Sequence, residues 1–452
     1  MKKKLTVQEY VVVASMLFGL FFGAGNLIFP VHMGQMAGSQ LVPATLGFLI
    51  TGVGLPLLSV AALGISKSEG LFDLSRKVSR PYAYFFTCLL YLTIGPFFAI
   101  PRCATTAFTV GIEQAVPQAA EQLRLWLLVF SAVFFAAALL FSLFPGKILT
   151  WVGKILNPFF LLFLGILIIV ALVKPSAAIS AVAPEGAYAS QAFSTGFLEG
   201  YNTMDVLAGL AFGIIVVQVI RELGVTDADA VASSTVKAGV FSSLLMALIY
   251  LAVTVVGAQS RGLFETSENG GIALAQIARH YLGSAGLVIL AATVTLACLK
   301  TSVGLITSCA ETFCGMFPKG PKYRAWAVLF TLISFALSNF GLSTIISYSV
   351  PVLMFLYPLA IALVLLALFG RFYRNDRVVY ISVIVCTLLA ALYDLICALP
   401  EGLYDALHAD AVQAFGLRVL PFAGAGLGWI CPLALGFVIG LAVHLMQKFR
   451  TK

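Results

Sequence analysis

The chain has 452 residues, of which 61% are hydrophobic and only 10% are charged, and its mean hydropathy is +1.02. About a quarter of the residues of a soluble globular domain are charged, so this composition excludes a water-soluble domain and indicates a protein with many membrane-spanning segments. The formal net charge of +8 could suggest a nucleic-acid partner, but the positions of the charges explain it differently.

Apolar stretches long enough to cross a bilayer, about 20 residues each, can be placed twelve times along the chain. They cover residues 9–37, 41–64, 82–112, 124–143, 148–173, 192–220, 236–258, 285–315, 325–340, 343–369, 378–398 and 421–447. The basic start Met1–Lys4 runs into a full-length apolar stretch rather than the short apolar core of a cleaved signal peptide. The sequence therefore predicts an all-α membrane protein with twelve transmembrane helices.

Most of the 27 lysines and arginines fall on one side of the membrane if the N-terminus is cytoplasmic. Cytoplasmic loops carry an excess of Lys and Arg, so both termini are expected in the cytoplasm and no nucleic-acid partner is expected. The charged linker 221–237 is expected to be a solvated cytoplasmic loop. Residues 399–420 are expected to form an outer loop.

The first span is interrupted at its midpoint by Gly23-Ala24-Gly25-Asn26, and Pro30 follows. Glycine and asparagine weaken a helix, and proline removes a backbone donor. The hydrocarbon core offers no water to satisfy a broken backbone, so such a break is tolerated only where it is buried in protein or lines a cavity. Transporters bind substrate at breaks of this kind.

The sixth span carries a matching interruption, Gly200-Tyr201-Asn202-Thr203-Met204-Asp205. Spans 1–5 (residues 9–173) and 6–10 (residues 192–369) form two halves of similar length and opposite orientation, and two further spans (residues 378–447) follow. Interrupted helices at corresponding places in two inverted halves indicate the binding site of a secondary transporter. The alternative, that the glycines only permit close helix packing, does not account for Asn26 and Asp205 at the two breaks.

The chemistry of a broken helix suggests the solute. The second half-helix presents free N–H groups and the positive end of its dipole, which suit a carboxylate. The preceding half presents free carbonyls, which suit a cation or an ammonium group, and sodium would add side-chain oxygens such as that of Asn26. The pattern predicts a small zwitterion or anion moved with a cation. Apolar residues near the breaks that could line the pocket are Phe21, Phe22, Phe97, Leu207 and Val303.

Ionisable residues inside the predicted spans refine this prediction. Asp205 lies near the centre of span 6, where it either marks a pathway or proton relay or caps the second half-helix. Lys300 lies near the centre of span 8, and Asp205 is its expected partner. Arg102 in span 3 and Glu199 before the second break either belong to an outer gate or snorkel to the surface. Asp394, within a few turns of a span end, is expected to snorkel.

Four segments of the chain resemble the motifs of the bacterial branched-chain amino acid:cation symporters. They are Phe22–Pro30 in span 1, Gly95–Arg102 in span 3, Gly200–Asp205 in span 6 and Thr301–Leu305 in span 8. The likeness extends from the first span to the last.

This resemblance implies uptake of leucine, isoleucine and valine across the bacterial inner membrane, coupled to a cation, with Na+ expected and H+ as the alternative. It implies the five-plus-five inverted repeat of the amino acid, polyamine and organocation transporters, a LeuT-like fold with helices 1 and 6 broken and with no cofactor besides the coupling ion. The substrate-binding residues it implies are Phe22, Gly23, Ala24, Gly25, Asn26, Phe97, Tyr201, Asn202, Thr203 and Asp205. The Na+ ligands it implies are Gly19, Phe22, Asn26, Ala297, Thr301 and Ser302.

Lys300 departs from the pattern of this family, because a small hydroxyl or apolar residue is expected at its place in the eighth helix. A lysine ammonium replaces the ion in some members of the superfamily. Lys300 therefore either fills the second cation site, or pairs with Asp205, or faces another helix. Proton-coupled or Na+-independent transport stays open, as does another small amino acid or solute as the substrate.

Two other classes of membrane protein fit the residues less well. An intramembrane enzyme needs a nucleophile–base pair or metal ligands, but the chain has no HExxH motif and its eight cysteines and four histidines are scattered. A channel needs a continuous polar lining, whereas spans 2, 4 and 5 are nearly devoid of polar residues. The sequence predicts a secondary active transporter that works by alternating access, and not an enzyme.

Overall fold

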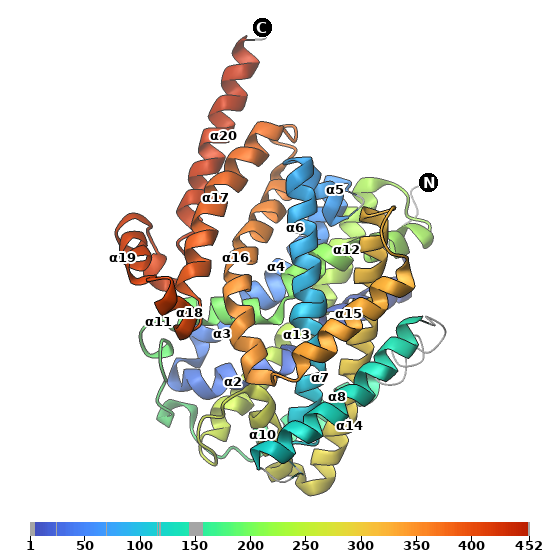
Figure 1. Cartoon of the computed structure of the whole chain (residues 1–452), viewed down its shortest axis with the longest axis vertical. Coiled ribbons are helices and arrows are strands. Elements are labelled where there is room, and N and C mark those ends of the chain that lie inside the picture. The colour runs from blue at the N-terminus through green and yellow to red at the C-terminus, as the bar shows by residue number, and fades with distance from the viewer. Residues whose placement is uncertain are drawn as a thin grey trace.

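The computed structural model describes residues 5–23, 25–68, 70–114, 116, 119–143 and 157–450. All regular secondary structure in these ranges is helical, as Figure 1 shows. In chain order the α-helices are α1 (Val7–Phe21), α2 (Gly25–Ala37), α3 (Leu41–Leu49), α4 (Leu55–Ser66), α5 (Leu71–Arg76), α6 (Arg80–Leu92), α7 (Ala99–Val110), α8 (Ala120–Leu143), α10 (Asn157–Val173), α11 (Tyr188–Glu199), α12 (Asp205–Glu222), α13 (Ala228–Ser260), α14 (Gly270–Met316), α15 (Tyr323–Ser338), α16 (Leu342–Phe369), α17 (Arg377–Cys397), α18 (Glu401–Ala406), α19 (Asp410–Val419) and α20 (Ile430–Arg450).

Eight helical segments of the described residues are long and apolar enough to cross a membrane, and three shorter apolar helices accompany them. The eight are Gly25–Ser66, Arg80–Val110, Glu121–Leu143, Asp229–Ser260, Gly270–Met316, Leu342–Phe369, Arg377–Cys397 and Ile430–Phe449. The chain is therefore a multi-pass membrane protein. The count of twelve spans stays a prediction, as do the residue limits of the two repeats.

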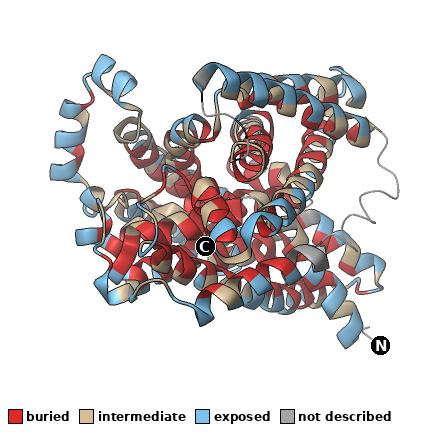
Figure 2. Cartoon of the chain, turned by 90° about the horizontal axis from the view of Figure 1, so that it is seen from below, coloured by how far each residue is buried: buried red, intermediate tan, exposed pale blue. Residues whose placement is uncertain are grey.

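Burial follows the pattern of a bundle that lies in lipid. Buried residues gather inside the bundle, while exposed residues lie along the outer helices (Figure 2). Many of the exposed side chains are large and apolar, such as Val133 on α8 and Leu248 on α13, which are 67% and 64% exposed. Such apolar surface would be costly in water, and a bilayer is the environment that accommodates it.

Both breaks expected from the sequence are present. Helix α1 ends at Phe21 and α2 begins at Gly25. Helix α11 ends at Glu199, and a tight turn, Gly200–Thr203, leads to α12. Met204 joins this turn to α12 in a left-handed conformation with φ 61°, which a residue with a side chain rarely adopts. Helices 1 and 6 are thus broken at the predicted positions.

A third interruption was not predicted. The third span, expected over residues 82–112, consists of α6 and α7 joined by a wide turn, Thr93–Phe97. Gly95 in this turn has φ −99° and ψ −120°, and Pro96 follows it. Proline cannot donate to a carbonyl of the preceding turn, so the pair Gly95-Pro96 ends α6 locally.

The expected loops 221–237 and 399–420 are shorter or more ordered than predicted. Helix α12 continues to Glu222, and α13 begins at Ala228 because the Asp227 carboxylate accepts a 3.2 Å hydrogen bond from the amide of Ala230. The outer loop contains α18 and α19. The last helix begins at Ile430 rather than at residue 421, and it projects beyond the bundle beside α17 (Figure 1).

Glycines bring two pairs of helices into backbone contact around the breaks. A Cβ on Gly34 of α2 would lie 2.1 Å from the carbonyl oxygen of Thr254 in α13. A Cβ on Gly196 of α11 would lie 2.0 Å from the carbonyl oxygen of Ala44 in α3. These glycines serve close packing, and so does Gly200 at the second break, where a Cβ would lie 1.9 Å from Oγ1 of Thr51.

Candidate functional site

Asn26 holds the first break together. The Gly23 amide donates a 2.8 Å hydrogen bond to Oδ1 of the Asn26 side chain. In a continuous helix the same amide would donate to the carbonyl four residues earlier, that of Gly19. The side chain of Asn26 thus releases the Gly19 carbonyl, which is one of the predicted Na+ ligands.

Asn26 also joins the two breaks to each other. Its Nδ2 donates a 2.7 Å hydrogen bond to Oδ2 of Asp205, the first residue of α12. The Tyr250 hydroxyl of α13 donates to the same oxygen at 3.2 Å and contacts the Asn26 amide. The three side chains are at most 2% exposed. Residues from the two predicted halves therefore form one buried polar cluster, Asn26–Asp205–Tyr250.

Asp205 does not cap its own helix. The Thr203 hydroxyl lies 3.4 Å from the Asp205 amide and donates to the carbonyl of Gly200 at 2.9 Å. The Asp205 carboxylate is directed at Asn26 and Tyr250 instead. The interpretation of Asp205 as a helix cap is therefore wrong, because its side chain satisfies groups of α2 and α13 rather than amides of α12.

Arg102 reaches both breaks from α7. Its Nη1 donates a 2.7 Å hydrogen bond to the carbonyl of Asn202, and its guanidinium lies 5.0 Å from the centre of the Phe29 ring. Its Nη2 lies 3.1 Å from the position that a Cβ on Gly25 would take. Arg102 is 4% exposed, and its charge interacts with that of Asp205. The expectation that Arg102 snorkels is wrong, because the break carbonyl and the Phe29 ring hold it inside the bundle.

The predicted cation residues of the eighth span lie beside the first break. The Thr301 hydroxyl is 3.7 Å from the position of a Cβ on Gly23, as is Oδ1 of Asn26. Thr301 donates to the Ala297 carbonyl at 3.0 Å. The Ser302 hydroxyl is buried and has no hydrogen-bond partner among the described residues. Helix α14 thus brings two hydroxyl oxygens toward the bundle interior, with that of Thr301 at the break.

Other predicted site residues are placed less centrally. Glu199 is half-buried at the end of α11, and Phe97 is 38% exposed with its ring against Phe98. Lys300 is half-buried on α14. The gate role of Arg102 and Glu199, the part of Phe97 in binding and the pairing of Lys300 with Asp205 stay predictions. Ala24 lies outside the described residues.

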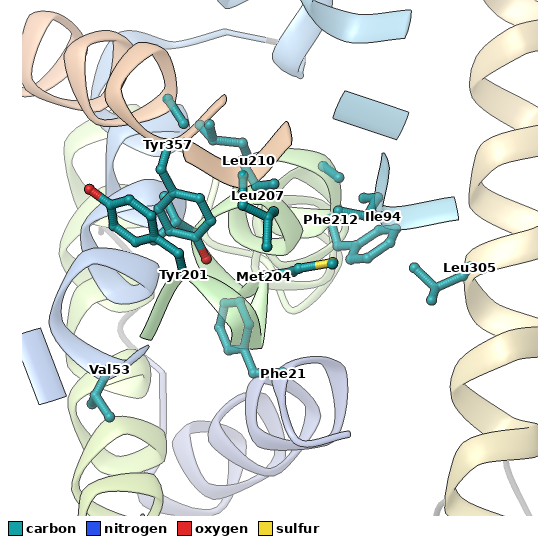
Figure 3. Close-up of a cluster of buried hydrophobic side chains, with 14 of the residues drawn as sticks. Phe21, Val53, Ile94, Tyr201, Met204, Leu207, Leu210, Phe212, Leu305 and Tyr357 are labelled. Atoms are coloured by element: carbon teal, nitrogen blue, oxygen red, sulfur yellow. The ribbon is translucent and has the colours of Figure 1, made fainter. Parts of the chain in front are cut away.

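Aromatic and apolar side chains form one wall of the site. Tyr201 stacks on Tyr357 of α16, with ring centroids 4.0 Å apart and an interplanar angle of 16°. Figure 3 shows Phe21, Met204 and Leu207 in the same cluster, below and beside the stacked rings. Sequence reasoning missed Tyr357 and Tyr250, because neither lies in a motif and each reaches the site only through the packing of distant helices.

The arrangement combines groups that suit a solute with both charges. Positive charge comes from Arg102 and the helix N-termini, the Asp205 carboxyl supplies acceptor oxygens, and an apolar wall lies beside them. Backbone, amide and hydroxyl oxygens are the ligands that hard cations prefer. Two broken helices that meet at a buried polar cluster inside a membrane bundle define a secondary transporter.

Comparison with solved structures supports this class. The chain resembles Mhp1 in its inward-facing conformation, with a TM-score of 0.64 and 16% identity over 98% of this chain and 91% of that one. It also resembles MhsT in complex with L-phenylalanine, with a TM-score of 0.57 and 15% identity over 98% of this chain and 99% of that one. The fold is therefore that of the LeuT-like transporters, as predicted.

Comparison with known sequences identifies the family. The family model described as branched-chain amino acid transport protein matches residues 6–447. The branched-chain amino acid permease BrnQ of Lactobacillus delbrueckii subsp. lactis is 53% identical over 450 residues, which cover 100% of both chains. The permease named BrnQ in Bacillus subtilis is 39% identical over 100% of both chains. The one in Escherichia coli is 37% identical over 98% of this chain and 97% of that one. The chain belongs to this family, and it is a transporter rather than an enzyme.

Proposed function

We propose that the protein imports leucine, isoleucine and valine by symport with Na+ through alternating access. The observation that carries this proposal is the 2.7 Å hydrogen bond between Asn26 and Asp205, because it joins the two broken helices at one buried place. The names of the relatives, which are branched-chain amino acid permeases, support the substrate class.

The amino acid lies between the two breaks. Its carboxylate binds the free amides at the start of α2 and α12, and its ammonium group binds the carbonyls that end the preceding half-helices. Its aliphatic side chain packs against Phe21, Met204 and Leu207, which are buried at the breaks. An apolar pocket separates neighbouring aliphatic groups by only about 1–3 kcal/mol per methylene, so one site accepts all three amino acids.

The sodium ion binds between the first break and α14. The Gly19 carbonyl, the Asn26 side chain and the Thr301 hydroxyl supply oxygen ligands of the kind that a hard cation takes. The Thr301 hydroxyl and Oδ1 of Asn26 each lie 3.7 Å from the position that a Cβ on Gly23 would take, which supports this placement. The ion holds α14 against the break and so stabilises the outward-facing state before the amino acid binds.

The membrane placement follows from charge. The protein lies in the bacterial inner membrane with both termini in the cytoplasm, because the excess of Lys and Arg then faces the cytoplasm. The structure supports a multi-pass arrangement through its eight long apolar helical segments.

Uptake of labelled leucine into proteoliposomes tests the proposal, with Na+ and H+ gradients imposed separately. An inward Na+ gradient is expected to drive uptake, and unlabelled isoleucine and valine are expected to compete. Uptake driven by the H+ gradient alone would overturn Na+ coupling. Failure of all three amino acids to bind, in a screen of amino acids against the purified protein, would overturn the substrate class.

A Lys300→Val variant separates the alternatives for the second cation. If the Lys300 ammonium acts as a cation in the site, the variant is expected to change the dependence of uptake on Na+. Uptake driven by Na+ and unchanged in Lys300→Val would remove Lys300 from the coupling mechanism.

A further inference from the structure

A second polar cluster adjoins the stacked tyrosines of the site, beside the second break. Four buried polar atoms there have no hydrogen-bond partner among the described residues, and they are the hydroxyls of Tyr201 and Tyr357, Oδ2 of Asp394 and Nε1 of Trp429. Asp394 is 3% exposed and Trp429 is 5% exposed. The expectation that Asp394 snorkels is therefore wrong, because the carboxyl is covered by the protein.

These side chains come from separate parts of the fold. Tyr201 belongs to the break itself and Tyr357 to α16, whereas Asp394 lies on α17 and Trp429 directly before α20. A Cβ on Gly428 would lie 3.6 Å from Oδ1 of Asp394, so the carboxyl faces the segment that carries Trp429. Helices α17 and α20 lie outside the two predicted repeats, and this cluster connects them to the break.

The stacked tyrosines link the two sides of the break. Figure 3 shows the hydroxyls of Tyr201 and Tyr357 at opposite ends of the stacked pair. The Tyr201 phenol lies near enough to Asp394, and the Tyr357 phenol to Asp205, for each pair to influence one another when ionised. The stacked pair therefore lies between these two carboxyls.

The chemistry of the cluster is complementary but incomplete. A tyrosine hydroxyl and an indole N–H are donors, and a carboxyl oxygen is an acceptor. A buried polar atom without a partner destabilises the folded state, so such groups in a native protein call for an explanation. The titratable groups that interact with Asp394 are Tyr201, Tyr393 and Cys397, and none of these three is a cation. Hydrogen bonds from the two donors are the means of satisfying this carboxyl.

We propose that Asp394 is a positioning residue for the substrate site. In one state of the transport cycle its carboxyl accepts hydrogen bonds from the Tyr201 hydroxyl and the Trp429 indole, and it thereby fixes the Tyr201–Tyr357 stack against the break. In the present structure the Tyr201 hydroxyl, Nε1 of Trp429 and Oδ2 of Asp394 have no hydrogen-bond partner within 3.5 Å among the described residues. Movement of the break during transport closes the cluster, so α17 and α20 control which state the substrate site adopts. This inference rests on the proposed function for its substrate.

A double-mutant cycle on leucine binding tests the proposal. Asp394→Leu removes the acceptor and Tyr201→Phe removes one donor, and each is expected to weaken leucine binding to the purified protein by about tenfold, the loss of one buried hydrogen bond. The double variant is expected to bind no more weakly than the weaker single variant. Tyr404→Phe is the matched control, because it removes a tyrosine hydroxyl that lies 2.8 Å from Oε1 of Gln413, and it is expected to bind as the wild type does. Losses that multiply in the double variant would overturn the proposal.

Fluorescence of Trp429 gives a readout that does not require leucine. In a protein whose other three tryptophans are replaced by phenylalanine, Asp394→Leu and Tyr201→Phe are expected to shift the Trp429 emission, and Tyr404→Phe is not. An emission unchanged by both variants would overturn the proposed contact. If the wild type fails to bind leucine while these shifts are present, the proposed substrate is wrong and the positioning role stands.

Discussion

Arg102 donates a 2.7 Å hydrogen bond from Nη1 to the backbone carbonyl of Asn202, and so joins the third span to the second break. The same guanidinium lies 5.0 Å from the centre of the Phe29 ring, directly after the first break. One side chain thus satisfies a carbonyl released at one break while it packs against the half-helix that follows the other. The two breaks are held together by this contact and by the Asn26–Asp205–Tyr250 cluster.

Replacement of Arg102 tests how far the site depends on this geometry. Arg102→Lys keeps the charge but loses the planar fork, so it cannot both donate to Asn202 and stack on Phe29. We expect initial rates of leucine uptake to fall by about tenfold, the loss of roughly 1.4 kcal/mol. The initial rate of leucine uptake is expected to fall further in Arg102→Met, because this variant removes the positive charge near Asp205 altogether. Arg124→Lys, at an exposed position, is the control, and wild-type rates in Arg102→Lys would refute the assignment.

Tyr250→Phe tests the buried polar cluster. The variant keeps the ring and removes the hydroxyl that donates to Asp205 at 3.2 Å. A buried acceptor that loses a partner costs about 1–3 kcal/mol, and Asp205 would retain its hydrogen bond from Asn26. We expect the Na+ concentration for half-maximal uptake to rise, because the Asn26 side chain is then less firmly placed. Tyr348→Phe, at a tyrosine that is 52% exposed, should leave this concentration unchanged; equal shifts in both variants would count against the cluster.

Features whose causes are local could be predicted from the sequence. Glycine, asparagine and proline within a few residues of each other weaken a helix wherever it lies, so the residues themselves mark the positions of both breaks. The carboxylate of Asp205 could be singled out because a charge inside a span is costly. The break at Gly95 has a local signal of the same kind, the pair Gly95-Pro96. This pair was interpreted only as part of the longer motif Gly95–Arg102, and its effect on the helix was not predicted.

The contacts that complete the site could not be predicted, because they join distant segments. Tyr250 lies 224 residues from Asn26, and Arg102 lies 100 residues from Asn202. A tyrosine in an apolar span has the same local pattern whether it faces lipid or a carboxylate. Asp394 is buried because the segment that carries Trp429 packs over it. Its position near the end of a span predicted snorkelling instead, because that position contains no information about the distant segment.

Gly196→Ala is expected to destabilise the protein strongly. The added Cβ would lie 2.0 Å from the carbonyl oxygen of Ala44, so α11 and α3 must separate, which costs typically about 1–3 kcal/mol. Gly304→Ala is the matched control, because nothing lies within 4 Å of a Cβ built there. Thermal unfolding of the purified variants in detergent measures the stability of each. A Gly196→Ala protein as stable as Gly304→Ala would contradict the backbone contact between these helices.

Glu113, in the segment that follows α7, is expected to make stability depend on pH. Burial, together with the nearby charge of Glu268, raises the pKa of Glu113, and a hydrogen bond with Thr109 opposes the rise. Because the folded state favours the protonated form, its contribution to stability is complete below the ordinary glutamate pKa of about 4.3. That contribution is lost as the pH rises through the higher pKa of the folded protein.

Glu113→Gln stays neutral at every pH, so it is expected to escape this loss. We expect the melting temperature of the variant, relative to the wild type, to increase as the pH is raised from about 4 to about 8. Glu265→Gln, at an exposed outer position, controls for the removal of a negative charge and is expected to show no such trend. A difference between Glu113→Gln and the wild type that stays constant, or decreases, as the pH rises would show that the carboxyl of Glu113 is not held in its neutral form by the fold.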